Sequence, residues 1–332
     1  MSDEEYLDIN ECFADNITKF RKTFWQTFKD WEGDAFKDIY SALPDPDSYS
    51  ERLYKFHERL WNNQRVKCNL ETLPEVGVFW SKTASAWELN RRNDNDSNDK
   101  KFRLGSDSFI SIYWHRENMQ KIVRDVSSNI TKTSEYIQFK KETEQLDKRT
   151  KENRCYDESW QRNNPVKLFI WRYLQKSNTI GGFIVFPRHD KSTINTARNA
   201  KFYDRFDLAL ECIRRYYLNP ENLTEEYNPL FCTLSYNTEF FDKEKEFFEM
   251  FGSFKNYIDF FCLQDWVSVD YQSVVNLLQH RDEKGNGIEV FKDKNPLPQN
   301  ETEWWLYYDR LMSLLEKRNK RIEEILNQKP NP

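Results

Sequence analysis

Glycine is scarce in this chain. Only 8 of the 332 residues are glycine, about a third of ordinary usage. Tight turns depend on glycine for backbone conformations that other residues avoid. The shortage of glycine, together with many Glu, Lys, Asn and Gln residues, therefore argues against a turn-rich β architecture and favours helices.

The chain also lacks an excess of one charge and any long apolar run. Its 50 basic and 55 acidic residues are interspersed and give a net charge of −5, so composition does not point to nucleic acid or an anionic membrane. No apolar run approaches the ~20 residues that cross a bilayer. The N-terminal MSDEEYLDINE is acidic and has no apolar signal segment. We therefore expect a cytoplasmic protein with no membrane partner.

Clustered cysteine and histidine residues are absent as well. There is no CxxC pair, and no histidine lies three to five residues from another, so the spacing indicates no metal site. In a chain of this size, widely spaced cysteines are typical of reduced, buried thiols. The residues concerned are Cys12, Cys68, Cys155, Cys212, Cys232 and Cys262, and His57, His115, His189 and His280.

Well-known catalytic motifs are missing too. The sequence contains no GxGxxG, no GxxxxGK[ST], no HExxH and no GxSxG. A Ser-His-Asp triad is assembled in space, and nothing in the sequence supports one. The cofactor is accordingly unknown.

What the chain has in abundance is aromatic side chains: 25 Phe, 17 Tyr and 11 Trp. Each ring buries a large area, so rings can build a sizeable core although only 38% of the residues are hydrophobic. We predict an α+β fold, a single predominantly helical domain over residues 1–332 around a small, partly buried β-sheet. Residues 90–101 and 140–156 are polar and are expected to be flexible or exposed.

Hydrophobic periodicity places the elements. The charged end of the last helix is expected to project into solvent, and 282–287 to form a tight turn. The expected helices are 48–61, 203–217, 238–251, 253–266, 271–280 and 301–328, and the expected strands are 104–114, 180–186, 230–236 and 288–291.

The most distinctive stretch is 179–217. Its apolar residues 180–186 have the profile of a central strand that is buried on both faces. Gly181 and Gly182 permit the close approach of another backbone or of a ligand. Arg188 and His189 follow the strand, and polar side chains just past a buried strand form a common site geometry.

The helix at 203–217 carries two carboxylates, Asp207 and Glu211, one turn apart. Such a like-charge pair is unfavourable alone, and nearby arginines can neutralise it. One interpretation is a structural ion-pair network. The other is a cleft in which Asp207, Glu211 and His189 are catalytic. In the second interpretation the substrate-binding residues are Gly181, Gly182, Arg188, Arg198, Arg205 and Arg215, because arginine grips phosphate oxygens in pairs.

Several segments resemble a family. The segments TIGGFIVFP (179–187), STINTARN (192–199), YDRFDLALECIRRYY (203–217) and FFEMFGSFKNYIDFFCLQDWV (247–267), with DPDSYSERLYKFHERLW (45–61) and LGSDSFI (104–110), are similar to an uncharacterised bacterial family classed only as a domain of unknown function. The resemblance runs from about residue 45 to about residue 319. It implies a bacterial intracellular protein built as one unit, with no established activity and no catalytic residues to carry over.

Three functional hypotheses remain open. The first is an enzyme acting on a phosphate-bearing substrate, nucleotide or nucleic acid, in a toxin or phage-defence setting. The second is a non-enzymatic protein-interaction module that uses residues 133–154 or the final helix. The third is an ADP-ribosyltransferase-like enzyme using His57, the Ser106–Asp107–Ser108 triplet and Glu211, although that pattern needs its Glu on a strand and Glu211 is expected in a helix.

Overall fold

The structure is a computed structural model. It describes residues 51–71, 73, 76–77, 87–89, 102–109, 177, 179–187 and 194–327. These residues all belong to one of two compact units of the chain, formed by 46–114 and 176–332. The other unit, 1–45 and 115–175, and the segments 90–101 and 140–156 lie outside the described residues, so the single-domain assignment stays a prediction.

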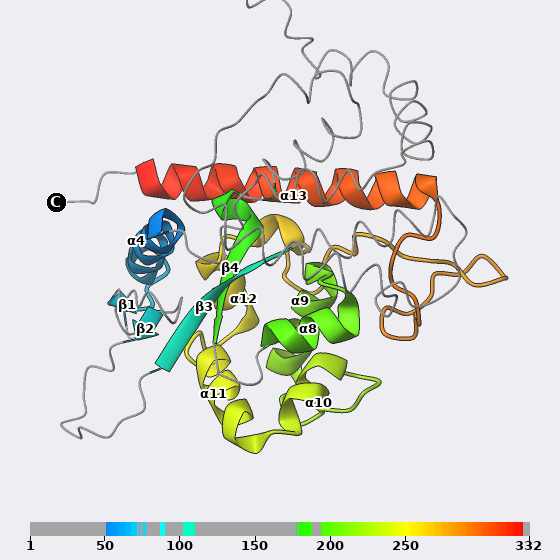
Figure 1. Cartoon of the computed structure of the whole chain (residues 1–332), viewed down its shortest axis with the longest axis horizontal. Coiled ribbons are helices and arrows are strands. Elements are labelled where there is room, and N and C mark those ends of the chain that lie inside the picture. Colours follow the sequence, from blue (N-terminus) through cyan, green and yellow to red (C-terminus); the bar gives the residue numbers. More distant parts are fainter. Residues whose placement is uncertain are drawn as a thin grey trace, which may run out of the picture. The chain divides into compact units, whose positions relative to one another are not determined.

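Helices dominate the described part and accompany a small antiparallel sheet, which confirms the predicted α+β class (Figure 1). The expected helix at 253–266 divides into α12 (Phe254–Phe260) and the 3-10 turn η5 (Gln264–Trp266). The α-helices of the described part are α4 (Glu51–Lys67), α8 (Ile194–Phe202), α9 (Phe206–Leu218), α10 (Pro229–Ser235), α11 (Thr238–Glu249), α12 (Phe254–Phe260) and α13 (Glu301–Asn327).

The sheet has the strand order β1-β2-β3-β4. Its strands are β1 (Val76–Gly77), β2 (Trp87–Leu89), β3 (Phe102–Ser108) and β4 (Phe183–Pro187). All five residues of β4 are buried, as predicted. The expected strand at 180–186 nevertheless begins only at Phe183, after a 3-10 turn at Ile180–Gly182. Moreover, β4 is the last strand in the described order and not a central one.

Side chains of α13 satisfy the backbone at the start of β4. The buried Arg318 guanidinium donates to the carbonyl oxygens of Gly181 at 2.8 Å and Phe183 at 2.7 Å. The Asn319 amide oxygen accepts from the Gly181 N–H at 2.6 Å. Carbonyl groups on an edge strand need partners once they are buried, and here a helix supplies them. Burial lowers the Arg318 pKa to about 10, because water no longer solvates its charge.

The core is built on rings, as the composition predicts. Residues of α11, of α12 and of the positions just after each helix form a continuous aromatic cluster. Trp61 of α4 joins it, with its ring centroid 4.8 Å from that of Phe260. Edge-to-face contacts of this kind add to the burial of the rings themselves. The cluster members include Phe247, Phe248, Phe251, Tyr257, Phe260 and Phe261.

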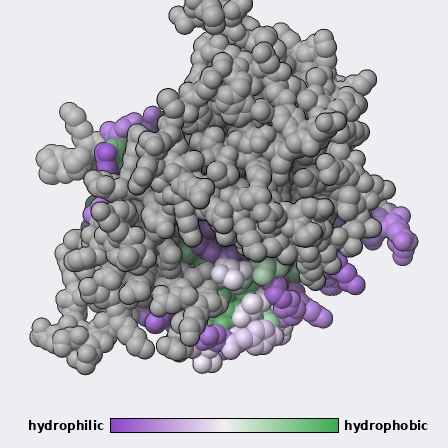
Figure 2. All heavy atoms as spheres, in the orientation of Figure 1, coloured by the Kyte–Doolittle hydropathy of each residue, from purple (hydrophilic) through white to green (hydrophobic). Residues whose placement is uncertain are grey.

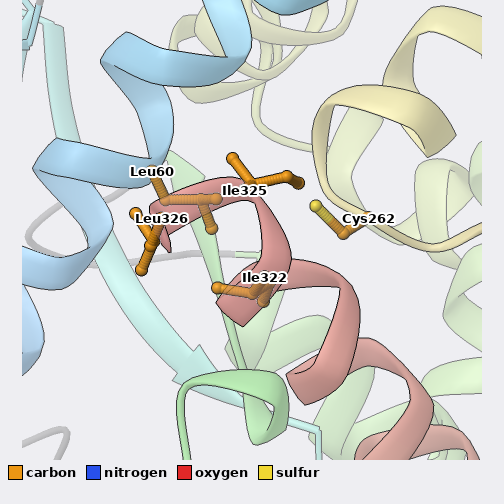
Figure 3. Packing of buried hydrophobic residues seen from close by; sticks show 5 residues of the cluster. All are labelled: Leu60, Cys262, Ile322, Ile325 and Leu326. Carbon is orange, nitrogen blue, oxygen red and sulfur yellow. The ribbon is translucent and has the colours of Figure 1, made fainter. Parts of the chain in front are cut away.

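The end of α13 does not project into solvent, and that expectation is wrong. Ile322, Ile325 and Leu326 are buried against Leu60 of α4 and Cys262 (Figure 3). In Figure 1, α4 lies beside the C-terminal part of α13. The charged residues at this end of the helix alternate with apolar ones that face α4, so the charge of the segment hid its buried side.

Three further expectations are wrong in the segment that follows α9. The segment 230–236 is not a strand: its residues up to Ser235 belong to the helix α10, because the Asn228 side chain caps this helix and Pro229 occupies its first turn. Residues 271–280 are not helical, since their backbone amides bind elsewhere: Val275 donates to the Trp266 carbonyl at 2.8 Å and Leu277 to the Asp207 carboxylate at 3.0 Å. Residues 288–291 form no strand.

No helix of the described part is long and apolar enough to cross a membrane. On the face drawn in Figure 2, described hydrophilic residues border described apolar ones in the lower part. Isolated apolar side chains on a surface are common. Those exposed in the described part come from five separate segments: Val66, Leu218, Tyr236, Val269 and Leu306.

Candidate functional site

Arg198, one of the predicted substrate-binding residues, lies in α8 and is 1% exposed. Its guanidinium forms an ion pair with Asp107 at the end of β3 and donates to the Ser108 carbonyl at 2.6 Å. Asp204 lies 3.7 Å away. The contacts therefore attach α8 to the sheet.

Arg205 and Asp207 form a second buried ion pair, at the start of α9. The Arg205 guanidinium also donates to the Pro296 carbonyl at 2.6 Å and to the Asn276 amide oxygen at 3.0 Å. The Asp207 carboxylate accepts from the Leu277 N–H at 3.0 Å. This pair fastens α9 to the irregular segment between η5 and α13.

Glu211 belongs to a third network. Its carboxylate accepts from Arg214 at 2.7 Å and from Arg215 at 2.8 Å. Arg215 in turn reaches Glu289 at 3.0 Å and lies over the Phe291 ring, 4.5 Å from its centroid. Each carboxylate of the like-charge pair is thus neutralised by its own arginine or arginines, as expected, and within the described part of the chain the two carboxylates share no ion-pair partner.

Gly181 and Gly182 accommodate the chain's own backbone. A Cβ atom on Gly181 would lie 2.7 Å from the Leu315 carbonyl oxygen of α13, and one on Gly182 would overlap the Ser177 carbonyl oxygen. Of the two roles expected for these glycines, close approach of another backbone is therefore present.

Arg188 and His189 lie outside the described residues, so their convergence with the other predicted residues stays a prediction. β4 ends at Pro187, opposite Leu104, whereas the Asp107 that holds Arg198 lies opposite Ile184. Three residues along a strand correspond to about 10 Å. The end of β4 and the anchor of Arg198 are therefore separated along the sheet.

A cleft of about 900 Å³ lies at the N-terminal end of α13, among residues that the sequence did not indicate as a site. Its wall includes a tight turn, as predicted for 282–287, in which the Asp282 carboxylate accepts from the Lys284 and Asn286 amides at 2.9 and 2.8 Å. The Asn286 amide lowers the pKa of the Asp282 carboxyl group. The lining residues are Gln279, His280, Arg281, Asp282, Glu283, Lys284, Ile288, Gln299 and Glu303.

His280 is the chemically most versatile residue of this cleft, and it is 8% exposed. Its Nδ1 lies 2.7 Å from Asp293 Oδ2, and its Nε2 lies 3.2 Å from Glu303 Oε2. A carboxylate oxygen accepts hydrogen bonds, so whichever ring nitrogen carries a proton donates to the carboxylate beside it. The two carboxylates fix the orientation of the ring in the cleft wall.

The carboxylates are themselves positioned by the backbone. Asp293 Oδ1 accepts from the Asn295 N–H at 3.0 Å, and Glu303 Oε2 accepts from the Gln299 N–H at 2.7 Å. Glu303 lies in the first turn of α13, and its backbone N–H donates to the side chain of Asn300, the residue just before the helix, at 3.0 Å. The Asn-x-x-Glu spacing before an aromatic run is the one local signal of this site in the sequence. Within the described part, no group of three or more His, Cys, Asp or Glu side chains is arranged to hold a metal ion.

One family model matches the chain. It describes a family of unknown function, DUF6994, and matches residues 139–322, more than half of the sequence. This range covers α8 to α12, the cleft and most of α13. No curated protein and no solved structure matches the chain.

Proposed function

The chain belongs to DUF6994, a family of unknown function, and we propose that it is an enzyme that acts on a phosphate-bearing substrate in the cleft at the N-terminal end of α13. His280 is the acid–base residue of this proposal. The single observation that carries it is the close pair of His280 and Asp293, 2.7 Å apart, in the wall of an open cleft.

Acid–base catalysis needs an imidazole whose orientation is fixed and whose second nitrogen faces the substrate. Asp293 fulfils the first condition, since its carboxylate holds Nδ1. The Nε2 side faces Glu303, whose side chain is 28% exposed and borders the cleft. A histidine oriented by a carboxylate is a recurring acid–base arrangement and contributes roughly 10²- to 10⁴-fold to a rate.

Two cations of the cleft wall are available to an anionic substrate, beside the carboxylates of Asp282, Glu283 and Glu303. Arg281 and Lys284 line the cleft, and the turn that carries them is fixed by Asp282. Arg281 donates to the Gly285 carbonyl at 2.6 Å, which uses one of the five donors of its guanidinium. Arginine and lysine are the side chains that bind phosphate groups most often.

The residues predicted from sequence take a supporting part in this proposal. Asp207, Arg205 and Arg215 hold the segment that forms the cleft, through their contacts with Leu277, Pro296 and Glu289. Of the alternatives, the interaction module relied on residues 133–154, which lie outside the described residues, or on the final helix, one side of whose end is buried against α4. Glu211, required by the ADP-ribosyltransferase hypothesis, lies in α9.

The first test detects ligand binding at His280 directly. In ¹⁵N imidazole NMR spectra, the His280 signals are assigned by their loss in a His280→Asn variant. Adenosine and guanosine monophosphates and diphosphates are then added to the wild-type protein. We expect the His280 signals to shift in a saturable manner with at least one of these nucleotides.

The second test measures turnover as phosphate release from the same nucleotides and from short oligonucleotides. His280→Asn and Asp293→Asn should each lower kcat by about 100-fold or more. Lys284→Ala should raise KM, whereas Lys292→Ala, an exposed lysine that does not line the cleft, is the matched control. Absence of turnover for every member of the panel would refute the proposal, whether or not the His280 signals shift.

A further inference from the structure

A backbone N–H group and a histidine ring nitrogen converge on one oxygen atom inside the cleft. Glu303 Oε2 accepts from the Gln299 backbone N–H at 2.7 Å and lies 3.2 Å from His280 Nε2. The His280 ring is 8% exposed and is held from its other side by Asp293. When Nε2 carries the proton, the two groups form a pair of fixed donors aimed at one point, which is the arrangement that binds an oxyanion.

The position of this oxygen favours negative charge for a second reason. It lies beside the N-terminal end of α13, a helix of 27 residues. The unpaired N–H groups and the dipole of such a helix stabilise an anion at that end. The oxygen that now benefits belongs to the protein itself, and it is carried by a side chain that borders an open cleft.

Helix capping explains only part of this contact. In a capping box, the Glu at the third helical position accepts from the N-terminal backbone, and the Asn300 and Glu303 pair follows that pattern. The contact with His280 adds nothing to the cap. A carboxylate needed only for capping would not have to cover the Nε2 of a buried histidine that a second carboxylate already orients.

We infer that the position of Glu303 Oε2 is the subsite for a phosphate oxygen of the substrate, and that Glu303 is a tethered occupant which the substrate displaces. The inference rests on the proposed function, since it specifies the ligand of the same cleft. On displacement, His280 Nε2 and the Gln299 N–H donate to the phosphate, and the Glu303 carboxylate moves into the cleft. The resting protein thereby keeps its acid covered until an anion of sufficient affinity arrives.

Inorganic phosphate is the probe for the test, and the His280 imidazole signals report its binding. If Glu303 competes for the two donors, removing its charge must tighten phosphate binding. We expect the phosphate dissociation constant of Glu303→Ala to be about tenfold or more below that of the wild type, the effect of one charge-assisted hydrogen bond. The dissociation constant of Glu303→Gln should lie between those of the wild type and Glu303→Ala. Glu323→Gln, which removes a charge from an exposed position of the same helix, should change it less than about twofold by screening.

The outcomes separate this inference from the proposed function. Unchanged or weaker phosphate binding in both Glu303 variants overturns the inference, even if nucleotides are turned over at His280. Tighter phosphate binding without turnover of any nucleotide supports the subsite and refutes the enzyme. If Glu303→Ala does not fold, Glu303→Gln decides alone, because glutamine retains the acceptor of the capping box.

Discussion

The buried histidine of α4 predicts how the protein loses stability in acid. The His57 side chain is 5% exposed, and its pKa is lowered from 6.5 to about 3, mainly because burial excludes water and in part because the Arg318 charge lies near. The unfolded chain therefore binds a proton at this residue below pH 6.5, whereas the folded protein does not until about pH 3. Stability is full above pH 6.5 and falls as the pH decreases through this window.

The size of the effect follows from the shift. Each pKa unit corresponds to 1.36 kcal/mol, so lowering the pH from 6.5 to 4 should cost roughly 3 kcal/mol of unfolding free energy from His57 alone. A domain of ordinary stability has about 5 to 15 kcal/mol. Titration of this single imidazole would then remove a substantial fraction of the total.

Urea unfolding of the wild type and of His57→Gln, measured at intervals from pH 7.5 to pH 4, tests this. The variant loses packing at every pH, so the informative quantity is the slope of unfolding free energy against pH. We expect the wild-type curve to fall more steeply below pH 6.5 and the two curves to converge towards pH 4. Parallel curves would refute the reasoning, because the other titrating groups are common to both proteins.

Two further predictions concern the interior. Gly182→Ala places a methyl group on the Ser177 carbonyl and should lower the unfolding free energy by about 3 kcal/mol or more, measured by thermal unfolding. The control is Gly252→Ala, which is strained by φ +70° but has open space around it and should lose about 1 kcal/mol. Similar losses at both glycines would contradict the close approach at Gly182. Burial raises the pKa of the Glu244 carboxyl well above its usual value, so the stability it contributes is present below about pH 4.5 and is lost as the pH rises. Glu244→Gln should be the more stable protein at pH 8 and lose this advantage at pH 4.5, and an equal difference at the two values would exclude the buried carboxyl as its source.

The strand at 180–186 illustrates how far sequence alone reaches. A short apolar, β-branched run predicts burial, and β4 is buried throughout. The same run does not reveal that its first residues form a 3-10 turn, in which the Gly181 N–H donates to Asn319, a residue 138 positions away. The glycine pair indicates a close approach of another segment but does not indicate which segment it is.

The charges of α9 show a similar division. The helical period places Asp207 and Glu211 one turn apart, and Arg214 and Arg215 at three and four residues from Glu211 are readable as its partners. The contact of Asp207 with the Leu277 amide is not readable, because residues 271–280 have an apolar period that suggests a helix. A tertiary hydrogen bond there outweighs local preference.

The candidate site escaped prediction for a reason that also explains its construction. His280, Asp293 and Glu303 are separated by 13 and 10 positions, and none belongs to a local catalytic motif. Around them, carboxylates replace regular backbone pairing: Asp282, Asp293 and Glu303 each accept backbone amides of the segment between η5 and α13. Two of these three carboxylates also hold the His280 ring. The same groups thus fix an irregular backbone and orient the imidazole, so neutralising Asp293 should loosen the cleft and release His280 together, while the aromatic core around α12 remains packed.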